Sequence, residues 1–527
     1  MAAWYRAGLE PAALALLALV VRLLHVRYTA KALVADDAVF FEEHAQRFLD
    51  AWAAIGTPGF APLLREAVDH ASLQGIVYPL FQSLVYGLAG GVQHTALLTA
   101  QAVLGALTVW LTYLTAREAF GRVAALAAGL LAATYPPFVL ASGLLLAEAL
   151  LLFIQALALY FLVRGLTRRL TWSRILGGFC IGLLMLRPAF QYAGPILFIA
   201  LAAIGALGAT PGAGARLRSA VQLAAPYLGG VLLVALPWLT VNGLVYGSFV
   251  WSRTGDAWQQ VYWGIYPPNR GWWPPDSPVP PKYGVDSLPG AWAAGIEIEA
   301  HDLDYLEAAV DQVRATPLQA LATVVNKLYQ AYLHPFNTYA EHPPLVGPLA
   351  VPLHRLLGLL ALAGLCLAWL RPAPAAVLGA ALSATSLPFL ASHIDVRYTI
   401  PAAQIGTSFA GLAVAQLGQA LRHRATWPYV LGIALPFGAW AIGVPHLVGL
   451  APGFAPWHAH LLNATLVCAA FVAAGWAAGR LLAVDGAADS RPLAAIWAGS
   501  SAVKPSARTL CLASGVAAGG LLAGIYG

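Results

Sequence analysis

An apolar stretch near the N-terminus, followed closely by two acidic residues, decides the fold. Residues 9–26 read LEPAALALLALVVRLLHV and residues 36–43 read DDAVFFEE. A helical run of this length approaches the roughly 20 residues that a hydrocarbon layer of about 30 Å requires. We therefore expect a first membrane helix with a carboxylate pair just beyond its outer end. Because Arg22, His25 and Arg27 interrupt the stretch, we expect a retained helix and not a cleaved signal peptide.

The composition places the rest of the chain in the membrane as well. Hydrophobic residues make up 60% of the sequence and charged residues 10%, whereas soluble chains carry about 45–50% and about 25%. So few charges cannot cover the surface of a water-soluble protein of this length, and the abundance of Leu, Val, Trp and Phe excludes disorder. We expect an all-α, polytopic membrane protein.

Several functional classes are disfavoured by the pattern of the remaining residues. The four cysteines form no CxxC pair, which argues against a disulfide framework or a zinc site. Lys and Arg occur singly or in pairs between apolar runs, so the net charge of +6 does not indicate a nucleic-acid partner. An HExxH spacing and a Walker loop are both missing from the sequence, so we expect neither a zinc hydrolase nor an ATP-dependent enzyme.

Apolar runs long enough to cross a bilayer recur along the chain and set its organisation. They predict about 11–13 transmembrane helices, at residues 9–26, 94–116, 122–140, 144–163, 174–188, 190–207, 220–238, 346–370, 373–391, 400–420, 427–446, 460–482 and 508–526. We expect an N-terminal transmembrane module (1–238) with a catalytic first external loop (28–93), a Trp- and Pro-rich external loop (239–345) and C-terminal transmembrane helices (346–527). Residues 301–333 are expected to form amphipathic surface helices.

The charged residues indicate which side of the membrane each loop faces. With the N-terminus inside, 16 of the 29 Lys and Arg residues fall in the cytoplasmic segments, as the positive-inside rule requires. Only four of the 23 acidic residues fall there: Glu10, Glu118, Asp485 and Asp489. The functional site is therefore expected on the external face.

Asp36 and Asp37 are the first candidates for chemistry. Two adjacent carboxylates at a membrane surface raise one another's pKa, and a nearby cation lowers it again, which is how a general base is tuned. The alternative is an ordinary solvated loop in which an Asp caps the following helix. The spacing alone does not separate these two interpretations.

Three further ionisable residues stand at predicted outer helix ends. Glu148 lies within an apolar run, where a carboxylate is costly and usually faces a polar cavity, although it could simply favour a helix N-terminus. Arg187 and Arg397 lie near the level of lipid phosphate headgroups, and arginine binds phosphate as a fork. The alternatives for the arginines are snorkelling, or pairing of Arg397 with Asp395.

These residues fall in motifs that resemble the GT-C glycosyltransferases, the superfamily of the protein O-mannosyltransferases and the lipid A aminoarabinose transferases. An acidic pair after the first membrane helix is the signature of that family. Further segments resemble the family in the same order: Val77-Tyr78-Pro79-Leu80, Ala116-Arg117 with Phe120-Gly121, Tyr135-Pro136-Pro137 followed by Leu146-Ala147-Glu148, Leu186-Arg187-Pro188, Pro237-Trp238 with Asn242, and Asp395-Val396-Arg397-Tyr398 with Pro401.

The resemblance implies a GT-C fold and transfer of a sugar from a polyprenyl-phosphate donor to a glycan, lipid or protein acceptor. It implies that Asp36 is the catalytic base beside Asp37, and that Arg187, Arg397 and Tyr398 bind the donor phosphate. Glu148 would orient the acceptor or, with Asp36, hold a divalent cation such as Mg²⁺ or Mn²⁺. The resemblance further implies a bacterial inner membrane, with the site facing the periplasm and surrounded by membrane lipids.

The second external loop is rich in tryptophan. Trp258, Trp263 and Trp272 present flat apolar faces suited to stacking on sugar rings. Anchoring at the membrane interface is the alternative, because aromatic belts occur without saccharide binding.

Two other functions share parts of this pattern. A transporter or flippase of a lipid-linked saccharide would show an internal repeat, and would have ionisable groups or broken helices near the midplane of the bilayer. A polymerase or ligase that uses diphosphate-linked glycans would have the same topology, but it would need more basic residues for the second phosphate.

Overall fold

The computed structural model describes residues 2–29, 36–71, 75–247, 249, 257–266, 278–285, 287, 290, 293–294, 302–321, 323–324, 327, 347–368, 372–392 and 396–420. Every regular element in these ranges is a helix, which confirms the all-α prediction. The predicted spans 427–446, 460–482 and 508–526 lie outside the described residues.

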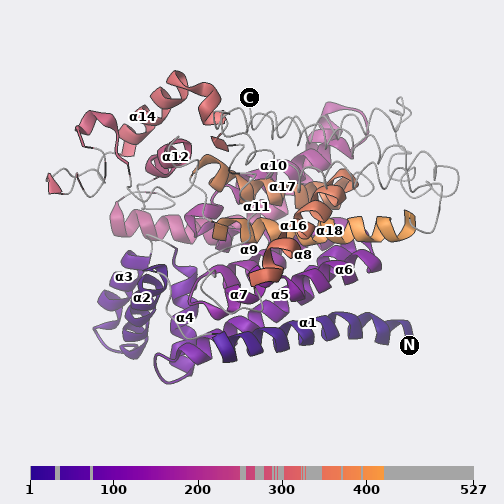
Figure 1. Ribbon diagram of the computed structural model, residues 1–527, viewed down its shortest axis with the longest axis horizontal. Helices are drawn as coiled ribbons and strands as arrows, with labels where there is room; N and C mark the ends of the chain where they lie inside the picture. The colour runs from indigo at the N-terminus through magenta and orange to yellow at the C-terminus, as the bar shows by residue number, and fades with distance from the viewer. Residues whose placement is uncertain are drawn as a thin grey trace.

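Long apolar helices form the body of the protein (Figure 1). Six described helical stretches are long and apolar enough to cross a membrane: Leu9–Tyr28, His94–Phe120, Glu148–Thr167, Pro188–Leu207, Ala213–Leu244 and Arg397–Gln419. They correspond to six of the predicted runs, so the protein is a multi-pass membrane protein. The long helices are α1 (Ala2–Thr29), α5 (His94–Phe120), α6 (Arg122–Thr134), α8 (Glu148–Thr167), α9 (Thr171–Met185), α10 (Ala193–Leu207), α11 (Ala213–Tyr246), α16 (Gly347–Cys366), α17 (Pro372–Ala391) and α18 (Ile400–Ala420).

Helices from the two predicted external loops gather at one end of this bundle, on the left in Figure 1. They are α2 (Asp36–Ala53), α3 (Phe60–Ala71) and α4 (Val77–Leu88) from the first predicted external loop, and α12 (Ala257–Ile265), η4 (Pro281–Tyr283) and α14 (Asp302–Ala315) from the second. Both segments therefore lie at the end of the bundle at which α1 finishes.

The predicted span 122–140 is broken in the structure. Helix α6 ends at Thr134, and the short α7 (Pro136–Leu140) and η1 (Ala141–Gly143) continue at an angle of 57°. Tyr135 is extended, with φ −65° and ψ 118°, as a residue before proline prefers. The next helix, predicted from residue 144, begins at Glu148, and residues 144–147 form a bend and a turn before it.

Arg22 closes the broken end of α6. Its side chain is 1% exposed, and its guanidinium donates to the carbonyl oxygens of Ala132 and Ala133 at 3.3 Å each. The last carbonyls of a helix have no partner within that helix, and within a membrane water cannot satisfy them. Arg22, which interrupts the first apolar run, therefore stabilises the end of α6 at the break.

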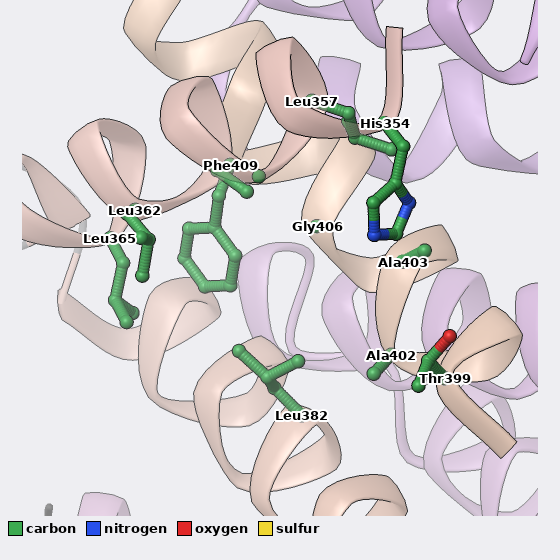
Figure 2. Close-up of a pocket in the computed structure, with 12 residues that line it drawn as sticks. His354, Leu357, Leu362, Leu365, Leu382, Thr399, Ala402, Ala403, Gly406 and Phe409 are labelled. Atoms are coloured by element: carbon green, nitrogen blue, oxygen red, sulfur yellow. The ribbon is translucent and has the colours of Figure 1, made fainter. Parts of the chain in front are cut away.

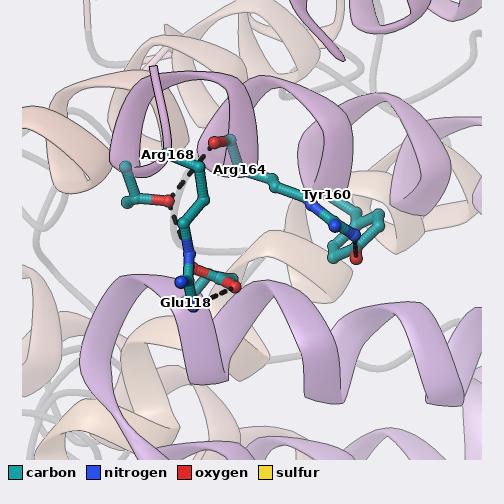
Figure 3. A network of polar contacts seen from close by, with 5 residues as sticks. Glu118, Tyr160, Arg164 and Arg168 are labelled. Carbon is teal, nitrogen blue, oxygen red and sulfur yellow. Dashed lines mark hydrogen bonds and ion pairs between the residues drawn. The ribbon is translucent and has the colours of Figure 1, made fainter. Parts of the chain in front are cut away.

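A second polar network lies at the other end of the bundle, between α5 and α8 (Figure 3). Arg168 donates to both carboxylate oxygens of Glu118 at 3.1 Å each. The guanidinium carbon of Arg164 lies 5.6 Å from the ring centre of Tyr160 and 5.9 Å from that of Trp172. Both arginines lie at the C-terminal end of α8, opposite the end that begins with Glu148.

Candidate active site

The acidic pair opens helix α2. Asp36 and Asp37 are its first two residues, a position at which the positive end of the helix dipole favours a carboxylate. An Oδ2–Nη1 contact of 2.8 Å joins Asp37 to Arg397. The two side chains are 32% and 17% exposed, so the ion pair is partly shielded from solvent. The structure thus brings together two motifs that the sequence places at opposite ends of the resemblance.

Arg397 and Tyr398 lie in η6 (Val396–Thr399), a single 3₁₀ turn that leads directly into α18. Both side chains are half-buried. Such a turn brings the arginine to the N-terminal end of α18, where α2 can meet it. The alternative pairing of Arg397 with Asp395 falls on a residue outside the described ranges.

Glu148 is the first residue of α8 and is 7% exposed. Its Oε2 atom is buried and has no hydrogen-bond partner among the described residues. A carboxylate held in such a place is costly unless a ligand, a proton or the helix dipole compensates. The position agrees with a group that meets a substrate or a cation.

Tyr78 and Gln101 connect the first predicted external loop to the backbone before Glu148. The Tyr78 hydroxyl donates to Gln101 Oε1 at 2.8 Å, and Gln101 Nε2 donates to the Leu144 carbonyl at 2.6 Å. Burial raises the pKa of Tyr78 well above its ordinary value, and the negative charge of Glu148 adds to the rise. The ring of Tyr78 lies 5.1 Å from that of Phe41 on α2. Glu148 and the acidic helix α2 therefore border the same region.

Sequence reasoning did not single out Gln101. The signal was a polar residue within the apolar run of α5, and the side chain is fully buried. A buried amide without partners would be unfavourable, so its presence inside a membrane helix indicated a hydrogen-bonded neighbour.

Arg187 lies between α9 and η2 (Pro188–Phe190). Its side chain is half-buried, and its Nη1 atom is buried without a hydrogen-bond partner among the described residues. Gly75, at φ +109°, packs against it so closely that a Cβ on Gly75 would lie 3.3 Å from the Arg187 Cα. A side chain at position 75 would therefore press on the backbone that carries this arginine.

An apolar pocket opens between α16, α17 and α18, next to the turn that carries Arg397. Figure 2 shows His354 and Thr399 toward one side of the pocket, with Phe409, Leu362 and Leu365 toward the other. Thr399, which lines the pocket, is two residues beyond Arg397. The Tyr135 hydroxyl pairs with His354 Nδ1, which ties the pocket to the break after α6.

The tryptophans of the second predicted external loop differ in exposure. Trp258 on α12 is 38% exposed, whereas Trp263 on the same helix is 3% exposed. The indole N–H of Trp263 donates to the Pro278 carbonyl at 2.8 Å, and its ring packs in a small core with Tyr262 and Tyr305. Burial leaves Trp263 no face for a sugar ring, so the structure does not support a stacking role for it. Trp272 lies outside the described residues.

The residues expected to hold a cation are only partly described. Over the described ranges, no group of three or more His, Cys, Asp or Glu side chains could together hold a metal ion. Glu148 offers one buried carboxylate oxygen, and the structure describes the backbone of Asp36 but not its side chain. The expected Mg²⁺ or Mn²⁺ therefore stays a prediction.

Comparison with known families supports the resemblance read from the motifs. Residues 69–240 match the family described as dolichyl-phosphate-mannose-protein mannosyltransferase. This segment includes Tyr78, Glu148 and Arg187, and the match confirms the predicted resemblance to the GT-C glycosyltransferases. No curated protein sequence matches the chain.

Solved structures of two membrane proteins are similar to this one. The Archaeoglobus fulgidus oligosaccharyltransferase AglB, in complex with an inhibitory peptide and a dolichol-phosphate, aligns at 14% identity with a TM-score of 0.47, over 95% of this chain and 61% of its own. ArnT from Cupriavidus metallidurans bound to undecaprenyl phosphate aligns at 16% identity with a TM-score of 0.43, over 98% of this chain and 77% of its own. The chain thus spans less than two thirds of the oligosaccharyltransferase. Likeness at this level does not identify a donor or an acceptor.

Proposed function

Because residues 69–240 match a family of membrane mannosyltransferases, we propose that the protein is a GT-C glycosyltransferase. It takes a sugar from a polyprenyl-phosphate donor and transfers it to a glycan, lipid or protein on the external face, the periplasmic face of a bacterial inner membrane. The observation that carries the proposal is the 2.8 Å ion pair between Asp37 and Arg397, which joins the acidic motif to the arginine motif at one end of the bundle.

The roles of the residues follow from their chemistry. Asp36 removes the proton from the acceptor hydroxyl as the anomeric carbon–oxygen bond to the lipid phosphate breaks. Arg397, with Tyr398 beside it and Arg187 as a second candidate, binds the phosphate that leaves with the bonding electrons. Asp37 holds the Arg397 guanidinium in place. The phosphodiester already stores the energy, so the reaction needs no nucleotide.

Further features fit the proposed donor and acceptor. The apolar pocket beside Thr399 suits an isoprenoid chain whose phosphate lies at Arg397. The buried Glu148 Oε2 atom suits an acceptor hydroxyl or a cation. Trp258, partly exposed on α12, is the remaining described candidate for stacking on a sugar.

The proposal is tested by incubating the purified chain in lipid nanodiscs with a panel of radiolabelled undecaprenyl-phosphate sugars and total envelope acceptors. We expect at least one sugar to move from lipid to acceptor, with release of undecaprenyl phosphate, and we expect the Asp36→Asn variant to lose the transfer. Release that is equally fast in parent and variant would contradict the assigned base.

A flippase or transporter of a lipid-linked saccharide is a second candidate, and one observation favours it. The α6–α7 span is broken by 57° and Arg22 is buried beside the break, which are features of membrane transporters. Movement of a fluorescent undecaprenyl-phosphate sugar across proteoliposomes, without transfer to any acceptor, would favour that candidate.

A further inference from the structure

Two glutamines join α8 to α18 inside the helical bundle. Gln155 and Gln404 are each 2% exposed. Gln155 Nε2 donates to Gln404 Oε1 at 2.7 Å and to the Pro401 carbonyl at 2.8 Å. Gln404 Nε2 donates in turn to the Leu152 carbonyl at 2.9 Å. The contact is therefore reciprocal, because each amide also binds the backbone of the other helix.

This pair is a costly way to fill space between two helices. Leucine would pack a membrane-embedded helix contact without burying polar atoms, whereas an amide needs every donor and acceptor satisfied. The Oε1 atom of Gln155 has no hydrogen-bond partner among the described residues. A polar contact kept at such a cost indicates a task that packing alone does not perform.

The bonds reach the helical turns that follow two candidate site residues. Leu152 stands one turn after Glu148 on α8, and Pro401 stands one turn after Arg397, at the start of α18. The glutamines themselves stand about two turns, or about 10 Å, below Glu148 and Arg397. Each glutamine lies seven residues after its site residue. Holding the two glutamines together therefore fixes the positions of Glu148 and Arg397 relative to one another along the helix axes.

We propose that Gln155 and Gln404 are positioning residues that hold Arg397 at a set distance from Glu148. The inference rests on the proposed function, since it assigns to the pair the task of aligning the phosphate-binding arginine with the buried carboxylate. Through Arg397 the alignment extends to Asp37 and helix α2. Neither glutamine touches the reacting atoms.

The test combines a double-mutant cycle with ligand binding, using the full chain in nanodiscs. The variants are Gln155→Leu, Gln404→Leu and the double variant. Each single change leaves the other amide buried and unsatisfied, so we expect a clear drop in thermal unfolding temperature. The double variant removes both amides, so its unfolding temperature should return toward that of the parent.

Binding of undecaprenyl phosphate is the readout that a purely structural role would not move. We expect the double variant to bind it about tenfold more weakly than the parent although its stability has recovered. Thr112→Val is the matched control, because Thr112 is also buried and its hydroxyl donates within its own helix, to the Thr108 carbonyl at 2.8 Å. It should bind undecaprenyl phosphate like the parent.

Two results would overturn the inference while leaving the proposed function intact. One is additive effects in the cycle, which would mean that the amides do not bind one another. The other is parent-like affinity in the stabilised double variant, which would limit the pair to packing. Failure of the parent itself to bind undecaprenyl phosphate would remove the proposed function, and the positioning role with it.

Discussion

Asp37 and Arg397, 360 positions apart in the sequence, lie 2.8 Å from one another where helix α2 meets the turn before α18. The pair is partly shielded, so its attraction is stronger than that of a fully exposed ion pair. Removing Asp37 takes away a carboxylate that binds the half-buried Arg397 guanidinium. Asp37 therefore holds the Arg397 guanidinium, and the base is proposed to be the neighbouring residue, Asp36.

Substitution of Asp36 and substitution of Asp37 should affect different measurements. In Asp36→Asn we expect sugar transfer to be lost while undecaprenyl phosphate still binds, because the base is removed and the arginine stays held. In Asp37→Asn we expect binding to weaken about tenfold, or about 1.4 kcal/mol, since Arg397 loses its anchor. Equilibrium binding and single-turnover transfer measure the two effects. Identical profiles for the two variants would contradict the division of roles.

Replacing Arg397 by lysine should not be conservative. Lysine keeps the charge but replaces a planar fork by a point charge, so we expect affinity for undecaprenyl phosphate to fall about tenfold or more. Arg187→Lys should act likewise if that arginine also meets the phosphate. Arg168→Lys is the control, because two nitrogens of Arg168 bind Glu118 at the other end of the bundle. An Arg397→Lys variant that binds as well as the control would refute a phosphate contact.

The buried Lys327 should make stability depend on pH. Its Nζ donates to the carbonyls of Leu390 and Ser392 at the end of α17, and burial lowers the pKa of Lys327 to about 7. The unfolded chain keeps this proton up to a pKa of about 10.4, so between these values it binds more protons than the folded chain. This group's contribution to the free energy of unfolding therefore grows with pH above about 7 and is lost as pH falls through it.

Thermal unfolding of the parent and of Lys327→Met, measured from about pH 6 to about pH 9, isolates this contribution. The difference in stability between parent and variant should increase in favour of the parent as pH rises above about 7. Parallel curves over the whole interval would show that the amine does not titrate there.

Much of the arrangement could be predicted from the sequence because hydrophobic runs report lipid crossings directly. The six spans followed from this, and the motif order predicted that Asp37 and Arg397 lie on the same side. The break at Tyr135 was missed, although the two prolines that follow it signal an interruption. In the sequence the apolar run looks continuous. The Arg22 side chain, which binds the free carbonyl oxygens at the break, comes from a distant part of the chain.

Contacts between distant helices could not be predicted in this way. The rotation of α2 about its own axis decides whether Asp36 or Asp37 faces Arg397. Two adjacent aspartates in the sequence give no information on this rotation. Gln101, Gln155 and Gln404 were visible only as polar residues in apolar runs. Their partners are backbone carbonyls and side chains that lie far away in the sequence. Trp263 looked like its neighbour Trp258 until burial separated them.

The sidedness of the site can be tested with cysteines at described positions. A cysteine at Asp311, whose side chain is 68% exposed on α14, should react with an impermeant thiol reagent in intact cells. One at Arg216, exposed at the start of α11, should react only after the membrane is opened. The parent chain measures the background from native cysteines, of which Cys180 is buried. The reverse pattern would place the site in the cytoplasm.

The most direct test of the central claim is an experimental structure of the full chain with undecaprenyl phosphate bound in a nanodisc. The account predicts that the phosphate lies within hydrogen-bond distance of the Arg397 guanidinium, and that the isoprenoid chain runs into the apolar pocket beside Thr399. Density for the phosphate at the Glu118 and Arg168 end of the bundle, or away from Arg397 with the Asp37 pair undisturbed, would contradict it.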